Sequence, residues 1–230
     1  MPNPNITFEF NPRIDSKAKL EKLVFTAYQA NRKFFGKDSS KIKITFLYQR
    51  AQMDKICKRK TQNWEVGHAF SQQNINHIAI FSPTVFDKVS NHPKSDFFYT
   101  LVHEIAHIFT HDLLGFYYPK WLHEGLAGYI AQQYRIRPVK YIYNFSKLHD
   151  SKNWNQYHHY PQAFSFTKYL IDKLGKKKML QFLKNLPKTL GRHHYPKDFT
   201  QFFNEFFNAD FNQLVSNWQQ TVVCLLTDCF

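Results

Sequence analysis

The sequence predicts an α+β fold, with an N-terminal lobe of helices and strands and a C-terminal lobe of helices alone. Strand-like segments occur only before residue 82. An apolar helical pattern without Pro or Gly then runs from Ser95 to Leu114, and the elements that follow are helical in pattern. The 230 residues suffice for one large domain or two small lobes. We therefore expect an N-terminal α/β lobe at residues 1–112 and a helical lobe at residues 113–230, together forming one compact unit.

The N-terminal lobe is expected to begin with an extended segment at residues 1–13, followed by a helix from Asp15 to Phe35. Asp15 or Ser16 is the expected N-cap of this helix, and Gly36 lies just past its end. Apolar residues at helical spacing mark its buried face: Leu20, Leu23, Val24, Ala27 and Tyr28. Further along, the pattern predicts strands at 41–48, 65–70 and 77–81, and a short helix at 51–60.

The C-terminal lobe is expected to contain several amphipathic helices. Their predicted ranges are 141–148, 164–174, 177–185, 199–207 and 211–226. Five phenylalanines share one side of the fourth of these segments: Phe199, Phe202, Phe203, Phe206 and Phe207. A stripe of this kind is more typical of a packed core than of a ligand site.

The helix predicted from Ser95 to Leu114, with Ser95 as its N-cap, contains the sequence HEIAH. His103 and His107 are four residues apart, so both imidazoles lie on one face of the helix and can reach one ion. Glu104 lies next to the first of them, where it can act as a base on water. The pentapeptide alone is also compatible with an ordinary amphipathic helix whose histidines are solvated or hydrogen-bonded.

A carboxylate with matching chemistry follows 17 residues after His107. Glu124 lies within the sequence WLHEGLA, which reads as the start of a second helix. Two histidines and one carboxylate leave a tetrahedral zinc ion one open position, which is typical of a catalytic site rather than a structural one. The sequence thus predicts one Zn²⁺ per chain, bound by His103, His107 and Glu124.

Three segments together resemble the gluzincin metallopeptidases, the superfamily that includes thermolysin and the zinc aminopeptidases. These segments are HEIAH, WLHEGLAGY and the stretch that begins Tyr160-Pro161-Gln162-Ala163, and the resemblance covers about residues 67–175. It implies a zincin-like fold, in which a mixed sheet and the HExxH helix form the first lobe and a cleft lies between the two lobes. It also implies that the chain hydrolyses peptide bonds.

The resemblance implies a role for each site residue. Glu104 is the general base that takes a proton from the attacking water and passes it to the leaving amine. Tyr160 is the candidate that stabilises the oxyanion, although His158 or His159 could do so instead, and Tyr160 could have a packing role only. His123 is expected either to line the cleft or to contact the metal ligands without binding the metal itself.

The strand from about His77 to Ser82 is implied to form the upper edge of the cleft. An open sheet edge can pair with extended peptide backbone, so His77, Ile78, Ala79 and Ile80 are candidate substrate contacts. His123, as a residue that lines the cleft, and His159, beside Tyr160, are two further candidates. An ordinary edge strand without a ligand is the alternative.

Two departures from the superfamily affect these expectations. The thermolysin-like carboxylate four residues after the glutamate ligand is replaced by Gly128, so the ligating histidines need another partner. The acidic strand that binds a free amino terminus in the aminopeptidases is missing, because Gly67-His68-Ala69-Phe70 contains no acid. An endopeptidase therefore fits better than an aminopeptidase.

The composition and charge of the chain limit the other functions that it could have. The net charge of +14 would favour acidic substrates through long-range attraction, but no nucleic-acid-binding motif accompanies the scattered lysines, so no specific nucleic acid is expected. Three cysteines form no disulfide framework, and neither a signal peptide nor a membrane-spanning segment is visible, so a cytoplasmic location is expected. Two alternatives to a peptidase remain: an inert zincin-like module that binds peptides or proteins, and a basic nucleic-acid-binding protein.

Overall fold

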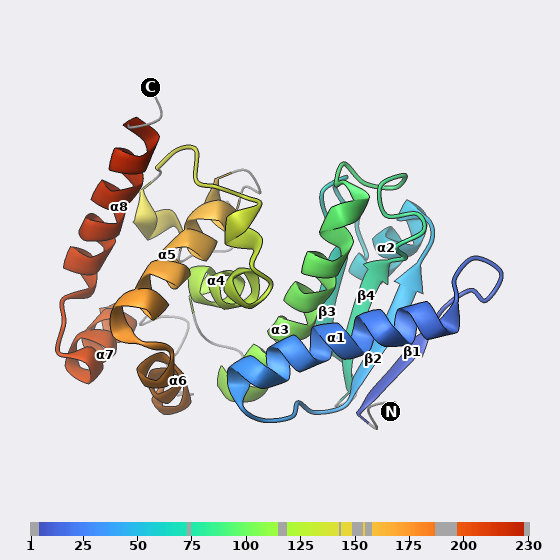
Figure 1. The fold of residues 1–230 in the computed structure, drawn as a ribbon, viewed down its shortest axis with the longest axis horizontal. Coiled ribbons are helices and arrows are strands. Elements are labelled where there is room, and N and C mark those ends of the chain that lie inside the picture. Colours follow the sequence, from blue (N-terminus) through green and yellow to red (C-terminus); the bar gives the residue numbers. More distant parts are fainter. Residues whose placement is uncertain are drawn as a thin grey trace. The chain divides into compact units, whose positions relative to one another are not determined.

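The fold is α+β, as the sequence predicts. The computed structural model describes residues 5–72, 75–114, 119–142, 144–148, 154, 158–186 and 197–227. The chain divides into two compact units, Met1–Asp112 and Leu113–Phe230. All strands of the described chain belong to the first unit (Figure 1).

A four-stranded mixed sheet forms the centre of the first unit. Its strands are β1 (Ile6–Glu9), β2 (Ile42–Leu47), β3 (Gly67–Gln72) and β4 (Ile75–Phe81). Their order in the sheet is β1-β2-β4-β3, with β1, β2 and β4 parallel and β3 antiparallel to β4. The mixed sheet is thus confirmed, and the predicted extended N-terminal segment contributes a strand to it.

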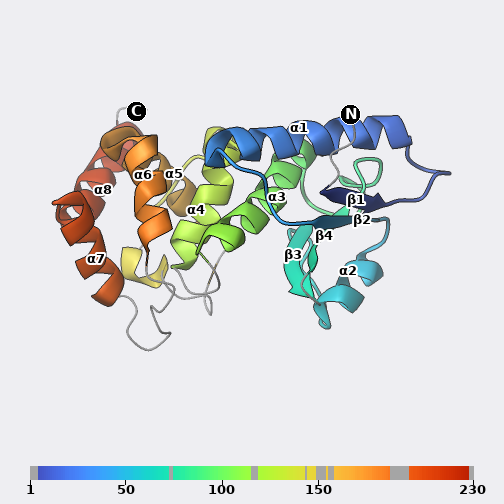
Figure 2. The same cartoon turned by 90° about the horizontal axis from the view of Figure 1, so that it is seen from below.

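Helices cover both faces of the sheet in the first unit. They are α1 (Lys17–Phe35), α2 (Arg50–Cys57) and α3 (Phe97–Leu114), the last preceded by a 3₁₀ turn, η1 (Lys94–Asp96). Figure 2 shows α1 and α3 on one side of the sheet and α2 on the other. Phe109 of α3 packs between two rings of α1, with centroid separations of 5.3 Å to Tyr28 and 5.3 Å to Phe35. This aromatic contact, deep in the apolar core, fixes the helix that carries the HEIAH sequence against α1.

Helix α1 ends as the sequence predicts, and of its two predicted N-cap candidates, Asp15 and Ser16, it is Ser16 that occupies the N-cap position. Gly36 adopts a left-handed conformation with φ of +68° and donates its N–H to Arg32, which ends the helix. Ser95 is not an N-cap of α3, because it lies inside the preceding 3₁₀ turn and Pro93 takes the capping position of that turn.

Asp15 has a different role from the predicted cap. Its buried carboxylate accepts hydrogen bonds of 2.7 Å from each of three hydroxyls, those of Tyr48, Ser82 and Thr84. Burial raises the pKa of Tyr48 to about 12. These bonds join the loop before α1 to the carboxyl ends of β2 and β4, and they satisfy a carboxylate that would be costly to bury alone.

Arg50, at the start of α2, organises the loop that leads into β3. Its guanidinium lies 4.5 Å from the centre of the Phe81 ring and donates to the carbonyls of Gln62, Asn63, Glu65 and Val89. Burial lowers the pKa of Arg50, against the opposing attraction of Asp54 and Glu65. The planar guanidinium carries five donors spread over a rigid fork, whereas an ammonium has three donors on one nitrogen and cannot reach carbonyls as far apart.

We therefore expect Arg50→Lys to lower the free energy of unfolding by about 2 kcal/mol, because four carbonyls, two of them partly buried, lose charge-assisted donors. Chemical denaturation would measure the change. Arg59→Lys is the matched control, since Arg59 is exposed and a lysine there can still pair with the partly buried Glu65, so this change should cost less than about 1 kcal/mol. Equal losses in the two variants would contradict the assigned role of Arg50.

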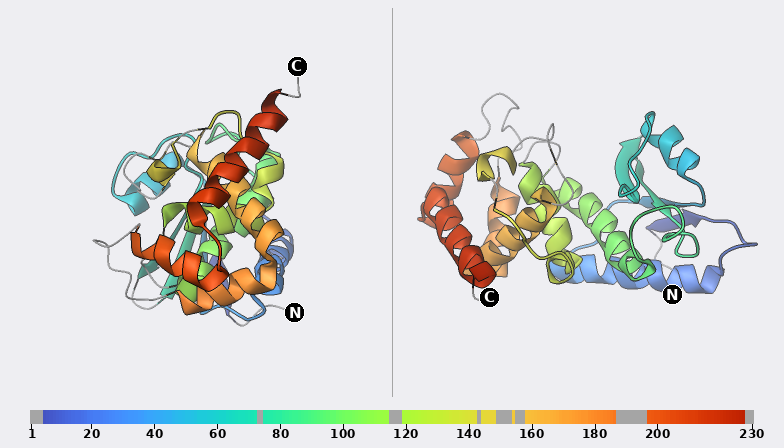
Figure 3. Two further views of the ribbon diagram at one scale, coloured as in Figure 1. Left: turned by 90° about the vertical axis from the view of Figure 1, so that its left-hand side faces the viewer. Right: turned by 90° about the horizontal axis from the view of Figure 1, so that it is seen from above.

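The described residues of the second unit form helices joined by turns and irregular segments, without a strand. Its elements are α4 (Lys120–Ile130), α5 (His159–Leu174), α6 (Lys176–Asn185), α7 (Lys197–Phe207) and α8 (Phe211–Thr227), with short 3₁₀ turns η2 (Gln133–Arg135) and η3 (Phe145–Leu148). Helix α5 contacts α4, α6 and α8, and Figure 3 shows α8 running beside it. The indole N–H of Trp218 in α8 donates to Ser165 in α5 at 3.1 Å.

An aromatic core holds these helices together. Trp121 of α4 is fully buried, with ring centroids 5.1 Å from Phe166 and 5.9 Å from Phe199. The predicted core role of the α7 phenylalanines is confirmed for Phe199, Phe203 and Phe207, which are buried. No described helix of this fold is both long enough and apolar enough to span a bilayer.

Candidate metal centre

Helix α3 presents the first two candidate ligands. His103 and His107 lie one turn apart, with ring centroids 4.5 Å from each other and planes nearly perpendicular at 88°. The helix is apolar on its other sides, where Leu101, Val102, Ile105 and Ala106 are buried. Both imidazoles are therefore held on one face by the packing of the rest of the helix.

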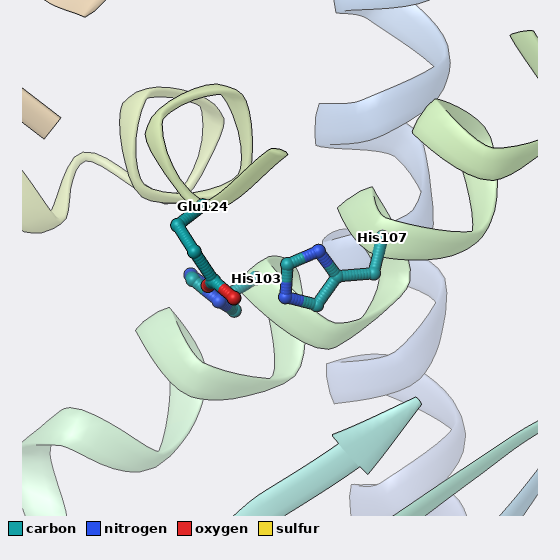
Figure 4. Close-up of side chains that lie close together, drawn as sticks. All are labelled: His103, His107 and Glu124. Atoms are coloured by element: carbon teal, nitrogen blue, oxygen red, sulfur yellow. The ribbon is translucent and has the colours of Figure 1, made fainter. Parts of the chain in front are cut away.

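Glu124 supplies the third candidate ligand from α4. One nitrogen of each imidazole and one oxygen of Glu124 all lie within 4.8 Å of one another. Figure 4 shows the Glu124 carboxylate directed toward the two rings. His103 and Glu124 are each only 7% exposed.

This donor set fits a transition-metal ion. The ligand atoms of a tetrahedral zinc ion are about 3.4 Å apart, so donor atoms separated by up to 4.8 Å would have to move closer by about 1 Å to bind one ion, which side-chain rotation can supply. Two neutral imidazoles and one carboxylate match zinc better than calcium or magnesium, which prefer oxygen ligands.

The main chain at the start of the HEIAH sequence is held by a residue that sequence reasoning missed. The side-chain amide of Asn31 in α1 donates to the carbonyl of Val102 at 3.1 Å and to the carbonyl of Ala27 at 3.0 Å. Asn31 is fully buried, and it lies three and four residues after the apolar Tyr28 and Ala27. The sequence does contain a sign of this role: Asn31 is a polar residue at a position that continues the apolar stripe of its helix.

Glu104 lies against the first residue of β3. A Cβ atom built on Gly67 would be 2.5 Å from Oε1 of Glu104. The carboxylate is therefore packed on the main chain of β3, which lies at the edge of the described sheet. The predicted general base and the edge strand of the described sheet are thus neighbours within one unit.

The prediction that the His77–Ser82 strand forms the sheet edge is wrong. β4 lies between β2 and β3, so the main chain of His77, Ile78, Ala79 and Ile80 faces a paired strand on each side. Ile78 and Ile80 are also buried in the core. The imidazole of His77 instead stacks on Phe70 at 5.2 Å. These four residues therefore offer no free main-chain edge to a peptide.

Three further predicted residues lie in the helical unit. His123 is partly buried, with Nδ1 4.0 Å from Oε1 of Glu124. Tyr160 lies in the first turn of α5 and packs edge-on against Trp154, with centroids 5.0 Å apart. His159 is buried beside the same indole at 5.6 Å. Their roles in substrate or transition-state binding stay predictions.

The close packing of α4 on α5 explains the glycines around Glu124. A Cβ on Gly128 would be 2.0 Å from the ring of Phe164, and one on Gly125 would be 2.0 Å from Oγ1 of Thr167. The volume that a carboxylate four residues after Glu124 would need is thus filled by Phe164. The same contact brings the Tyr160-bearing helix against the Glu124-bearing helix.

Comparison with known proteins gives a family. Curated protein sequences provide no significant match to the chain. The family model described as "BSP: Peptidase of plants and bacteria" matches residues 24–218, which is well over half of the chain and includes His103, Glu104, His107 and Glu124. The chain therefore belongs to this family of peptidases.

Proposed function

We propose that this peptidase is zinc-dependent and of the gluzincin type, with His103, His107 and Glu124 as ligands. The observation that carries the proposal is the convergence of three suitable donor atoms within 4.8 Å beside a buried glutamate. A zinc ion held there would polarise the substrate carbonyl and lower the pKa of water to about 7. Membership of a peptidase family gives this chemistry its substrate class, a peptide bond.

Glu104 is the proposed general base. It follows the ligand His103 directly, and its carboxylate is held against β3, so a peptide lying along that strand would place its scissile bond near the carboxylate. Glu104 takes a proton from the attacking water and delivers it to the departing amine. The phenol of Tyr160 would donate a hydrogen bond to the oxyanion, with His158 or His159 as the alternative donor.

The substrate is proposed to add to the sheet at β3. Within the described sheet, β3 is paired on one side only, so an extended peptide could pair with its other side. No residue of Gly67–Gln72 is acidic, so this strand has no carboxylate to bind a free amino terminus. These features favour an endopeptidase over an aminopeptidase. The positive net charge would draw in acidic substrates, and added salt should weaken that attraction.

Removal of the metal from the purified chain tests the proposal. Metal analysis should find one zinc per chain, and dialysis against a chelator should abolish cleavage of a mixed peptide library. Zinc added back should restore cleavage, because the ligand set is regenerated. Cleavage that continues in the metal-free protein would contradict zinc dependence, and peptide binding without cleavage by the zinc-loaded protein would favour the inert binding module.

A further inference from the structure

Gly67 occupies a position at which a side chain has no room. A Cβ atom there would lie 2.5 Å from Oε1, 2.6 Å from Cδ and 2.6 Å from Cγ of Glu104. All three separations are well below the normal contact distance of carbon and oxygen atoms, about 3.5 Å. The backbone does not require glycine, because Gly67 lacks the positive φ of Gly36 and Gly175. The requirement for glycine therefore comes from the carboxyl side chain of Glu104.

Glu104 cannot easily move away from such an atom. Rotation of the terminal carboxyl group would move the two oxygens but would leave Cγ and Cδ in contact, so the whole side chain would have to change rotamer. The residue is only 7% exposed, which leaves little open space for another rotamer. The helix itself is held in place by the bond from Asn31 to Val102.

The strand cannot easily withdraw either. Gly67 is paired with Ile80 of the central strand β4. The preceding carbonyl, that of Val66, accepts the N–H of Phe81 at 3.2 Å, and the carbonyl of Glu65 is held by Arg50. Two independent anchors thus fix the main chain at the point where Glu104 packs on it.

We infer that Gly67 is a positioning residue for the general base: its bare main chain forms the surface that sets the direction of the Glu104 carboxylate. This inference rests on the proposed function, because it assigns the catalytic role to Glu104. A side chain at position 67 would turn the carboxylate away from the attacking water. It would leave in place the imidazoles and the Glu124 carboxylate, none of which is among the nearest atoms to the added Cβ.

Steady-state kinetics of Gly67→Ala test the catalytic consequence. We expect kcat to fall at least about 100-fold, because a displacement of about 1 Å in a reacting group costs this much, while KM changes less than about threefold. Zinc stoichiometry should stay at one per chain. An unchanged kcat, or a loss confined to KM, would overturn the inference, since Gly67 would then act on the substrate or not at all.

A double-mutant cycle in the metal-free protein tests the contact without any activity measurement. Gly67→Ala should lower the melting temperature by about 5 °C when Glu104 is present, as expected for overpacking. The shift should persist in the Glu104→Gln background, because glutamine has the same shape. It should vanish in the Glu104→Ala background, because the atoms that clash are gone. The same shift in all three backgrounds would overturn the inference.

The two measurements separate this inference from the proposed function. If the wild-type chain cleaves peptides and the cycle shows no coupling, the positioning role fails while the zinc peptidase assignment stands. If the wild-type chain with zinc cleaves nothing, the proposed function fails. The positioning role then fails with it, even if the cycle shows that Gly67 and Glu104 are in contact.

Discussion

Replacement of Glu104 by glutamine is expected to reduce kcat/KM for peptide hydrolysis by about 10³-fold or more. The amide has the shape of the carboxylate but cannot accept the proton of the attacking water, and general-base catalysis of this kind contributes about 10²–10⁴-fold. Steady-state cleavage of a fluorogenic peptide would measure the loss. Zinc content should be unchanged, because Glu104 is not among the three grouped donor residues.

The matched control is another acidic residue of the same helix. Asp112 lies near the end of α3 and accepts hydrogen bonds from the main chain and hydroxyl of Ser40 at 2.7 and 2.8 Å. Asp112→Asn weakens this anchor of the helix without touching the proposed chemistry, so it should lower the melting temperature and keep hydrolysis. Activity in Glu104→Gln within tenfold of the wild-type value would refute the assigned base.

The candidate ligands could be found in the sequence because their geometry is local. Residues four apart on a helix share a face whatever surrounds the helix, so HEIAH alone predicts that His103 and His107 converge. Glu124 lies on another helix, so its assignment rested on the ligand chemistry of zinc and on the resemblance of its surrounding sequence to a known superfamily. The structure places one donor atom of each residue in a common group.

The order of the strands could not be predicted in the same way. A period of two indicates a strand but does not say which strands are its neighbours. The burial of β4 was nevertheless encoded in its sequence: Ile78 to Phe81 is a continuous apolar run, which is typical of a strand covered on both faces. β3, with the sequence GHAFSQ, is mixed in polarity and suits an edge.

The hydrogen bonds that hold the surrounding elements in place join residues far apart in the chain. Asn31 and Val102 are separated by 71 positions, and Asp15 and Ser82 by 67. No local pattern reports such a pairing. Gly67 is similar, because a glycine in a strand can indicate a bulge, a bend or a close approach, and only the position of Glu104 decides among them.

Replacement of Glu124 by alanine is expected to weaken zinc binding by more than about 100-fold. In comparable sites, loss of a residue that hydrogen-bonds to a metal ligand already lowers the metal affinity 10–100-fold. Glu124 is itself a proposed ligand, and it is the only carboxylate in the group. Competition with a chromophoric chelator would measure the affinity. Glu124→Asp is the graded control, because it keeps the charge on a shorter side chain and should bind zinc with intermediate affinity.

Thermal unfolding gives an independent measure of the same loss. A ligand that binds only the folded chain stabilises it by about 2.7 kcal/mol at 100 times its dissociation constant, so zinc should raise the melting temperature of the wild-type protein by several degrees. The same zinc concentration should leave Glu124→Ala nearly unchanged, since its sites would be mostly empty. Alanine at position 124 should alter the metal-free protein less, because α4 is anchored on α5 by close packing at Gly125 and Gly128, which the substitution does not touch. An equal zinc-induced shift in the wild-type and variant proteins would show that the ion binds elsewhere, and the hydrolytic mechanism would lose its third ligand.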